Sequence, residues 1–217
     1  MNGKYYNQIW SIRAIVTVIV CLLFAVSVAL FIVLNSSIVF IHLPQSQLKI
    51  SKENLQSDYW QIIKYLQLPW IEQLRLTYLP ITKHALIHFR EVKSLILVDE
   101  LVAIISGLSL PILLLKVKQQ NQLWRLILPF KLMIVVLIVV GFMGMTDFTN
   151  AFIQFHHLVF NNMNWVFNPK NDPVILLMPE QFFEVLFILW CGIAGVIFGL
   201  FYVWTWWHLR LFFRGKL

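Results

Sequence analysis

Four long apolar runs constrain this chain more than any other feature of its sequence. They cover about residues 14–34, 94–115, 126–145 and 185–207. At about 1.5 Å per residue, a helix of about twenty residues crosses the roughly 30 Å hydrocarbon core of a bilayer. With 59% hydrophobic residues and a mean hydropathy of +0.76, the chain holds more apolar surface than a soluble domain of this size buries. The sequence therefore predicts one all-α integral membrane domain, residues 1–217, with four transmembrane helices.

The distribution of charged side chains predicts the orientation of these helices. Four spans place both termini on one side of the membrane, and that side carries basic residues with no Asp or Glu among them. By the positive-inside rule, the termini are expected in the cytoplasm, and the segments 35–93 and 146–184 are expected to be extracytoplasmic. The basic residues on the termini side are Lys4, Arg13, Lys116, Lys118, Arg125, Lys131, Arg210, Arg214 and Lys216.

Both extracytoplasmic segments are expected to contain short interfacial helices. In residues 57–67, Tyr59 and its apolar neighbours recur at helical spacing against polar residues, which is typical of a helix lying on the membrane. Thr82 is placed to cap a helix that continues through His88 into the second span. Residues 148–155 predict a second amphipathic helix, and the Asn-rich stretch after it predicts a polar loop.

Histidines are concentrated in the two extracytoplasmic segments. A partly desolvated histidine beside lipid is a natural proton acceptor and donor, because imidazole titrates near neutral pH. The alternative is that these amphipathic rings only decorate the interface. The residues in question are His42, His84, His88, His156 and His157, whereas only His208 lies near the cytoplasmic end.

His88 has neighbours that favour a functional role. On a continuous helix Glu91 lies one turn after His88 on the same face, where it is able to orient the imidazole. Asp99 follows on that face below the membrane boundary, where ionisable groups are expensive and usually face the bundle interior or water. A charge pair with Lys93 at the start of the helix is an equally good interpretation of these residues.

The adjacent pair His156 and His157 diverges by about 100° on a helix, so at most one of them is expected to share a site with His88. Spacing alone does not choose between them. No third ligand completes a metal site around the pair, so no metal is expected. The chain also contains no P-loop, dinucleotide fingerprint or nucleophile elbow. We therefore expect no cofactor, and covalent catalysis lacks an obvious nucleophile, although a Ser/His pair is an alternative.

Small residues inside the apolar runs are interpreted as packing residues. Cys21 and Cys191 lie within spans, which argues against a disulfide. Cys191, Gly195 and Gly199 form a ladder at i+4 spacing that predicts close packing against another helix.

Several motifs in the extracytoplasmic segments are similar, in the same order, to those of a known family. Together they resemble the four-helix lipoprotein intramolecular transacylases, Lit, of Gram-positive bacteria, over essentially the whole chain. The sequence departs from that pattern at Thr82 and Ala85, where Ser and Gly are expected. The motifs are Tyr59-Trp60, Tyr65-Leu66, His88-Phe89-Arg90-Glu91-Val92-Lys93, Phe155-His156-His157-Leu158-Val159-Phe160-Asn161-Asn162, Trp165-Val166-Phe167-Asn168-Pro169, Asp172 and Pro179-Glu180-Gln181-Phe182-Phe183.

The resemblance implies an acyltransferase that moves the sn-2 acyl chain of a diacylglyceryl-modified cysteine to that cysteine's own α-amine. The substrate is then a diacylated lipoprotein in the outer leaflet of the cytoplasmic membrane, and the product is its lyso form. His156 or His157 is implied as general base and acid, assisted by His88, and alignment on the Phe-His start favours His156. The residues expected to bind substrate are Glu91, Asn161, Trp165 and Asp172.

The main alternative is a non-enzymatic membrane chaperone or assembly partner with an aromatic extracytoplasmic surface. It accounts for the aromatic residues but leaves the clustered histidines unexplained. A transporter is disfavoured because the spans are mostly continuous, without broken helices in matching halves. Membrane lipid is an expected partner, and nucleic acid is not.

Overall fold

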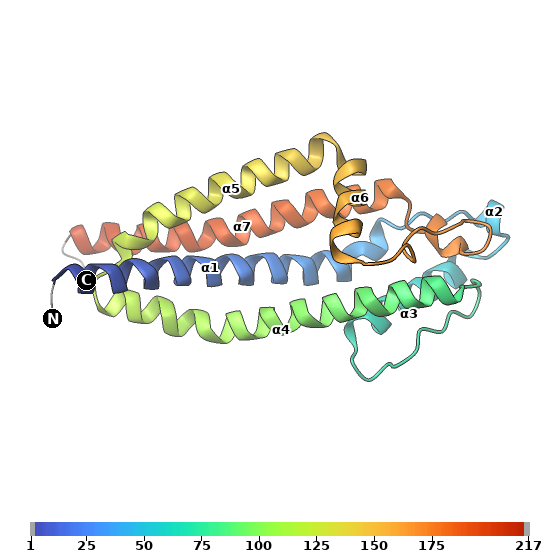
Figure 1. Cartoon of the computed structure of the whole chain (residues 1–217), viewed down its shortest axis with the longest axis horizontal. Coiled ribbons are helices and arrows are strands. Elements are labelled where there is room, and N and C mark those ends of the chain that lie inside the picture. The colour runs from blue at the N-terminus through green and yellow to red at the C-terminus, as the bar shows by residue number, and fades with distance from the viewer. Residues whose placement is uncertain (1–2, 215–217) are drawn as a thin grey trace. The chain divides into compact units, whose positions relative to one another are not determined.

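The computed structural model describes residues 3–214, with side chains from residue 10 onward. Within this range every regular element is a helix (Figure 1). Of the charges used to predict orientation, Lys216 lies outside the described residues, as does the side chain of Lys4. The elements are α1 (Gly3–Ser36), η1 (Ser37–Val39), α2 (Gln45–Leu48), α3 (Lys52–Gln67), α4 (Lys83–Gln119), η2 (Leu123–Leu126), α5 (Ile127–Thr146), α6 (Phe148–Val159), η3 (Pro173–Leu176) and α7 (Glu180–Phe213).

Four helical stretches are long and apolar enough to cross a membrane, which confirms the predicted fold class. Each contains one of the four apolar runs and extends beyond it. The second reaches back to Lys83 because Thr82 caps α4, as expected: its Oγ1 accepts a hydrogen bond of 3.2 Å from Ala85 N. The four stretches are Trp10–Val39, Lys83–Gln119, Leu123–Thr146 and Glu180–Phe213.

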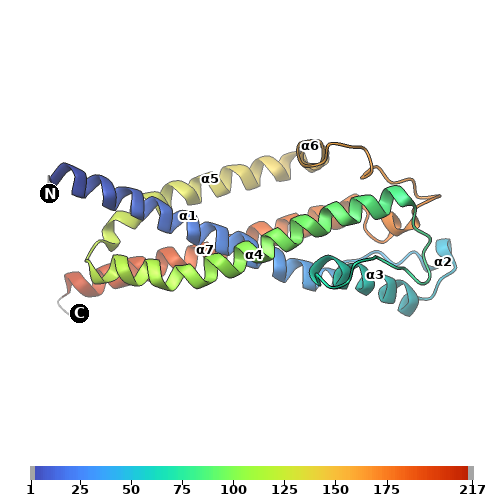
Figure 2. The same ribbon diagram turned by 60° about the horizontal axis from the view of Figure 1, so that its bottom comes forward.

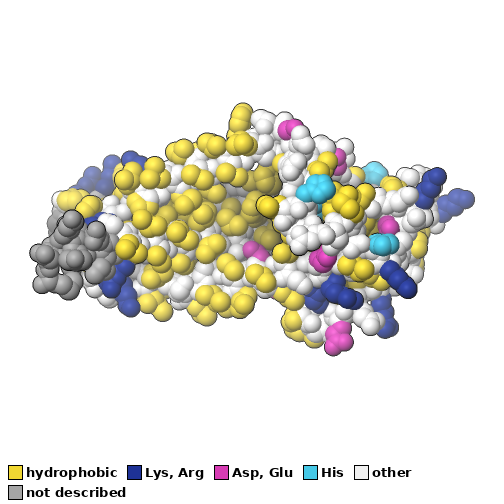
Figure 3. Space-filling view, in the orientation of Figure 1, with side chains coloured by type: hydrophobic (Ala, Val, Ile, Leu, Met, Phe, Trp, Pro, Cys, Tyr) yellow, Lys and Arg dark blue, Asp and Glu magenta, His cyan; other side chains and the backbone are white. Residues whose placement is uncertain are grey.

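The chain forms two compact units that share its long helices. Unit 1 comprises residues 1–30, 101–143 and 190–217, and it contains both chain termini. Its core includes Cys21 and the ring pair Phe130 and Phe198, 5.2 Å apart. Many large apolar side chains of its helices are exposed, as lipid-facing surfaces require. Figure 3 shows this surface as a broad yellow band.

The glycine ladder of α7 is not used as the sequence predicts. A Cβ added at Gly195 or Gly199 meets no atom within 4 Å, so this face packs against no described helix of the chain. By contrast, the predicted packing role of Cys21 holds, because its side chain is completely buried. Spacing identifies a small-residue face but not whether a partner helix covers it.

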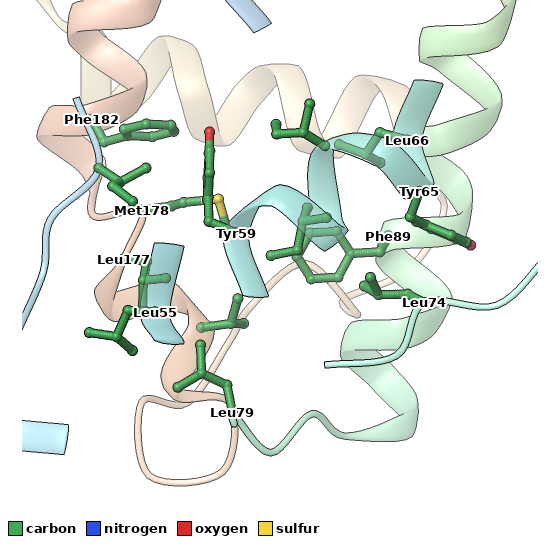
Figure 4. Packing of buried hydrophobic residues seen from close by; sticks show 14 residues of the cluster. Leu55, Tyr59, Tyr65, Leu66, Leu74, Leu79, Phe89, Leu177, Met178 and Phe182 are labelled. Atoms are coloured by element: carbon green, nitrogen blue, oxygen red, sulfur yellow. The ribbon is translucent and has the colours of Figure 1, made fainter. Parts of the chain in front are cut away.

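Unit 2 comprises residues 31–100 and 144–189, and it therefore joins the two predicted extracytoplasmic segments. Its core is built around α3, and Figure 4 shows residues of this core converging from α3, α4 and α7. Tyr59 packs edge-on against Phe182, with ring centroids 6.2 Å apart. The Tyr59 hydroxyl also lies 2.5 Å from Ser37 Oγ.

The apolar face of α3 differs from the expectation in what it contacts. Tyr59, Ile63 and Leu66 are buried within the protein core rather than offered to lipid, whereas Trp60 is 40% exposed. The hydrophobic periodicity correctly locates a helix and its apolar face. It does not tell whether this face contacts a membrane or other parts of the protein.

Two buried charged residues hold the segment between α3 and α4. The carboxylate of Asp58 is fully buried and accepts backbone hydrogen bonds from Thr77, Tyr78 and Leu79 at 2.8, 2.9 and 2.8 Å. The ammonium of Lys93 donates to the carbonyls of residues 68 and 71 at 2.9 and 2.6 Å. These bonds fix the irregular segment that leads into α4. Figure 2 shows the course of this segment between α3 and α4.

Candidate active site

His88 and His156 are brought together in unit 2. His88 lies in the second turn of α4 and His156 near the end of α6, and their ring centroids are 5.9 Å apart. Each residue is only 8% exposed. Burying two polar rings side by side costs free energy, and such an arrangement is typical of a functional site.

The hydrogen bond of His156 determines which of its ring nitrogens is basic. Nδ1 lies 2.7 Å from the carbonyl oxygen of Phe152, one turn earlier in α6. Because a carbonyl only accepts, Nδ1 carries the proton and donates, which leaves the lone pair on Nε2. Burial lowers the pKa of His156, the bond to Phe152 partly opposes this, and repulsion from His157 lowers the pKa further. His156 is therefore a neutral base at neutral pH.

His88 has a buried ring nitrogen, Nδ1, without a hydrogen-bond partner among the described residues. Such an orphan atom is costly in a finished core and common at a site that awaits a ligand. A substrate group that reaches His88 Nδ1 gains a hydrogen-bonding partner there.

Aromatic rings enclose both histidines. Phe160 and Phe167 meet the His88 ring edge-on, with centroids 4.9 and 5.6 Å away. Phe152 and Trp165 lie tilted against His156 at 4.2 and 4.8 Å. These walls exclude water, which strengthens the electrostatic interactions of any reacting group inside. They are also suited to hold an acyl chain.

The other histidines of the two predicted extracytoplasmic segments are not part of this buried pair. His157 is exposed and packs against the edge of Trp165 at 5.3 Å. His84 donates through Nδ1 to Asn164 Oδ1 at 2.8 Å, and His42 is exposed. Adjacent helical positions diverge, so burying His156 beside His88 directs His157 outward.

Glu91 connects α4 to the loop that follows α6. Its Oε1 accepts a hydrogen bond of 2.7 Å from Asn162 Nδ2, and its Oε2 is buried without a partner among the described residues. Asn162 also accepts from Trp165 Nε1 through its backbone carbonyl at 3.0 Å. Asn161, which the sequence suggested for substrate binding, is exposed. Sequence reasoning missed the role of Asn162 because neighbouring asparagines give no signal that separates them.

Both carboxylate oxygens of Asp172 are hydrogen-bonded within the protein. Its two carboxylate oxygens accept from the backbone N and the hydroxyl of Thr82, at 2.8 and 3.1 Å. Thr82 is the cap of α4, so Asp172 anchors the start of the helix that carries His88 and Glu91. The expected contact of Asp172 with substrate stays a prediction beside this positioning role.

Within the described residues, no group of three or more His, Cys, Asp or Glu side chains is arranged to hold a metal ion. The site instead offers one neutral imidazole base, one imidazole with an unpartnered nitrogen, and one unpartnered carboxylate oxygen. This set is able to move protons and to stabilise charge. It supplies no nucleophile of its own.

Comparisons of the sequence and of the fold with known proteins point to the same family. Residues 11–183 match the sequence model of a family described as lipoprotein intramolecular transacylase Lit. A direct sequence comparison with curated proteins finds no match.

Three solved structures share the fold, and each is the membrane integral lipoprotein intramolecular transacylase Lit from Bacillus cereus. One aligns with a TM-score of 0.74 and 20% identity over 96% of this chain and 99% of that one. The other two carry a histidine substitution. The first aligns with a TM-score of 0.78 and 20% identity over 98% of this chain and 98% of its own. The second aligns with a TM-score of 0.76 and 20% identity over 97% of this chain and 100% of its own.

Proposed function

The chain belongs to the lipoprotein intramolecular transacylase family of acyltransferases, and we propose that it moves the sn-2 acyl chain of a diacylglyceryl cysteine to the α-amine of the same cysteine. The amine nitrogen attacks the ester carbonyl, a C–N bond forms, and the C–O bond to the glyceryl oxygen breaks. The product is a lyso-form lipoprotein with an N-acylated terminus. The observation that carries this proposal is the buried pair of His88 and His156 in a site without a nucleophile.

The absence of a nucleophile suits a reaction within one substrate molecule. Amine and ester belong to the same modified cysteine, so folding them together supplies much of the barrier reduction that a covalent intermediate otherwise provides. The aromatic walls around Phe160 and Trp165 are surfaces against which the acyl and glyceryl groups pack. What remains for the protein is proton transfer and charge stabilisation.

His156 is the proposed general base and acid. Its Nε2 takes the proton that the attacking amine loses and returns it to the glyceryl oxygen as that group leaves. The bond from Nδ1 to the Phe152 carbonyl holds the tautomer in which Nε2 is basic and stabilises the imidazolium when it forms. We prefer His156 to His157 because His156 is buried beside His88, whereas His157 is exposed.

His88 and Glu91 are proposed to bind the charged parts of the reacting centre. A protonated Nδ1 of His88 donates to the oxyanion that develops on the ester carbonyl. The free Oε2 of Glu91 accepts from the substrate ammonium and helps to orient it. Asn161 and Trp165 are proposed to contact the substrate beside His156, and Asp172 acts through Thr82 by fixing α4.

We further propose that the site is extracytoplasmic in a bacterial cell membrane, with both termini in the cytoplasm. The basic residues that lie among α1, α4, α5 and α7 in unit 1, with no acidic residue beside them, support this orientation. The site then opens where mature lipoproteins lie, in the outer leaflet.

Mass spectrometry of lipoprotein N-termini tests the proposed reaction. A strain that produces only diacylglyceryl lipoproteins is compared with the same strain expressing this protein. We expect N-acylated lyso-lipoproteins only in the second strain, and labelled sn-2 chains of the substrate should appear on the α-amine of the same molecule. Unchanged N-termini, despite protein in the membrane, would favour the assembly-partner interpretation instead.

The pH dependence of acyl transfer tests the role of His156. The base form exists above the pKa of His156, so activity falls as pH drops through that pKa. Replacing His157 by Gln removes the repulsion that lowers the pKa of His156, so the acidic limb of the kcat/KM profile should move to higher pH. The substrate amine titrates identically in both proteins and cancels in the comparison.

His42→Gln is the matched control, because it removes an exposed histidine of unit 2 that is not among the causes of the pKa shift of His156. Its profile should superimpose on that of the parent protein. A His157→Gln profile that shifts to lower pH, or an equal shift in both variants, would contradict the assignment.

A further inference from the structure

Unit 1 contains basic residues that no acidic side chain neutralises. All Asp and Glu residues of the chain lie in unit 2, so residues 1–30, 101–143 and 190–217 carry only positive charge. Figure 3 shows Lys and Arg side chains gathered at the end of unit 1 where the termini lie in Figure 1. In a membrane, the counter-charge for such a cluster comes from outside the protein.

A groove between α1 and α4 has the shape and chemistry for a bound anion with an apolar tail. Its volume is about 540 Å³, and apolar side chains such as Val16 and Leu113 form part of its walls. Arg13 and Lys116 contribute a guanidinium and an ammonium to its lining. Among the described side chains, neither has a hydrogen-bond or ion-pair partner, and Arg13 only stacks on Trp10 at 4.9 Å.

A second groove, between α1 and α5, differs from the α1–α4 groove in the bonding of its basic side chain. It has a similar volume of about 510 Å³ and is lined by Arg125. That guanidinium is already bonded, through Nε to Gln122 Oε1 at 2.7 Å and through Nη1 to Ser11 Oγ at 3.3 Å. The α1–α4 groove therefore differs from the α1–α5 groove, because its two cations, on Arg13 and Lys116, have no hydrogen-bond or ion-pair partner among the described side chains.

We propose that the α1–α4 groove binds one anionic phospholipid. Its phosphate lies between Arg13 and Lys116, and one acyl chain runs along Val16 and Leu113 toward the membrane interior. A free phosphate or a soluble anion lacks the tail that the apolar walls match. A zwitterionic lipid carries its own cation and leaves the charge of the groove uncompensated. An anionic lipid satisfies both the walls and the charge.

Native mass spectrometry of the full-length protein in detergent tests this proposal. The protein is titrated with phosphatidylglycerol and, separately, with phosphatidylcholine of identical acyl chains. We expect one saturable site for phosphatidylglycerol. In the Arg13→Gln/Lys116→Gln variant its affinity should fall on the order of thirtyfold, because each basic side chain near an anionic lipid contributes about fivefold.

Two further variants separate the groove from general charge. Lys131→Gln/Arg214→Gln removes the same charge from exposed positions of unit 1 outside the groove and should leave the affinity unchanged. Arg13→Lys/Lys116→Arg keeps the charge and should retain the site. The proposal is overturned if both lipids bind equally, if the two glutamine variants weaken binding equally, or if glycerophosphoglycerol without acyl chains binds as tightly.

Discussion

Replacing His156 by alanine is expected to lower the rate of acyl transfer by about 10²- to 10⁴-fold, the range that general acid–base catalysis contributes. The substrate amine is mostly protonated at neutral pH and needs an acceptor for its proton, and the leaving glyceryl oxygen needs a donor. His156 is buried, neutral and held by Phe152 in the tautomer whose Nε2 is free to do both. The rate is measured by mass spectrometry of the acyl shift on a purified diacylated lipopeptide.

His157→Ala is the matched control for this prediction, because it removes the adjacent ring from an exposed position. It should retain most of the activity at neutral pH. Thermal unfolding of both variants checks that the loss in His156→Ala is catalytic, since its ring also packs against Phe152 and Trp165. Full activity in His156→Ala, or a greater loss in His157→Ala, would remove His156 from the mechanism.

Much of the fold follows from simple periodicities in the sequence. The four spans are visible because about twenty apolar residues in succession have few alternatives to a transmembrane helix. The start of α4 was also predictable, because Thr82 precedes a helical run and its hydroxyl satisfies an otherwise free N–H. Such features depend on residues that are close together in the chain.

The site was predictable only in part, because its geometry depends on contacts between distant segments. Clustering and family resemblance pointed to His88, His156 and His157, but a sequence separation of 68 residues between the first two gives no distance in space. Asp172 illustrates the difficulty, since a conspicuous polar residue in a loop is as consistent with a substrate contact as with an anchor for Thr82. That a buried atom such as Glu91 Oε2 lacks a hydrogen-bond partner in the described part of the chain is evident only when the positions of all its neighbours are known.

Asp58 is a second residue whose importance appears only in three dimensions. In the sequence it is one polar position of an amphipathic helix, where a carboxylate normally faces water. In the structure it is fully buried and gathers three backbone N–H groups from residues 77–79. These bonds couple α3 to the segment that ends at Thr82, and thereby to the helix that carries His88.

Asp58→Asn is therefore expected to destabilise unit 2 by about 3 kcal/mol, although the side chain keeps its size. An amide offers one acceptor oxygen where the carboxylate offers two, and its NH₂ group would oppose one of the backbone donors. A buried hydrogen bond to a charged group is worth about 1.5 to 3 kcal/mol, and an orphaned donor adds its desolvation cost. The loss should appear as a lower Tm and as faster tryptic cleavage after Arg75, an exposed residue in the released segment.

Glu53→Gln provides the control for Asp58→Asn, because it makes the same chemical change in the exposed first turn of the same helix. Water solvates that position in either form, so cleavage after Arg75 should stay near the parent rate. Acyl transfer in Asp58→Asn should fall together with the Tm and recover at lower temperature, since Asp58 positions α4 without touching His88 or His156. Normal protection of Arg75 in Asp58→Asn would show that the three backbone bonds do not hold this segment.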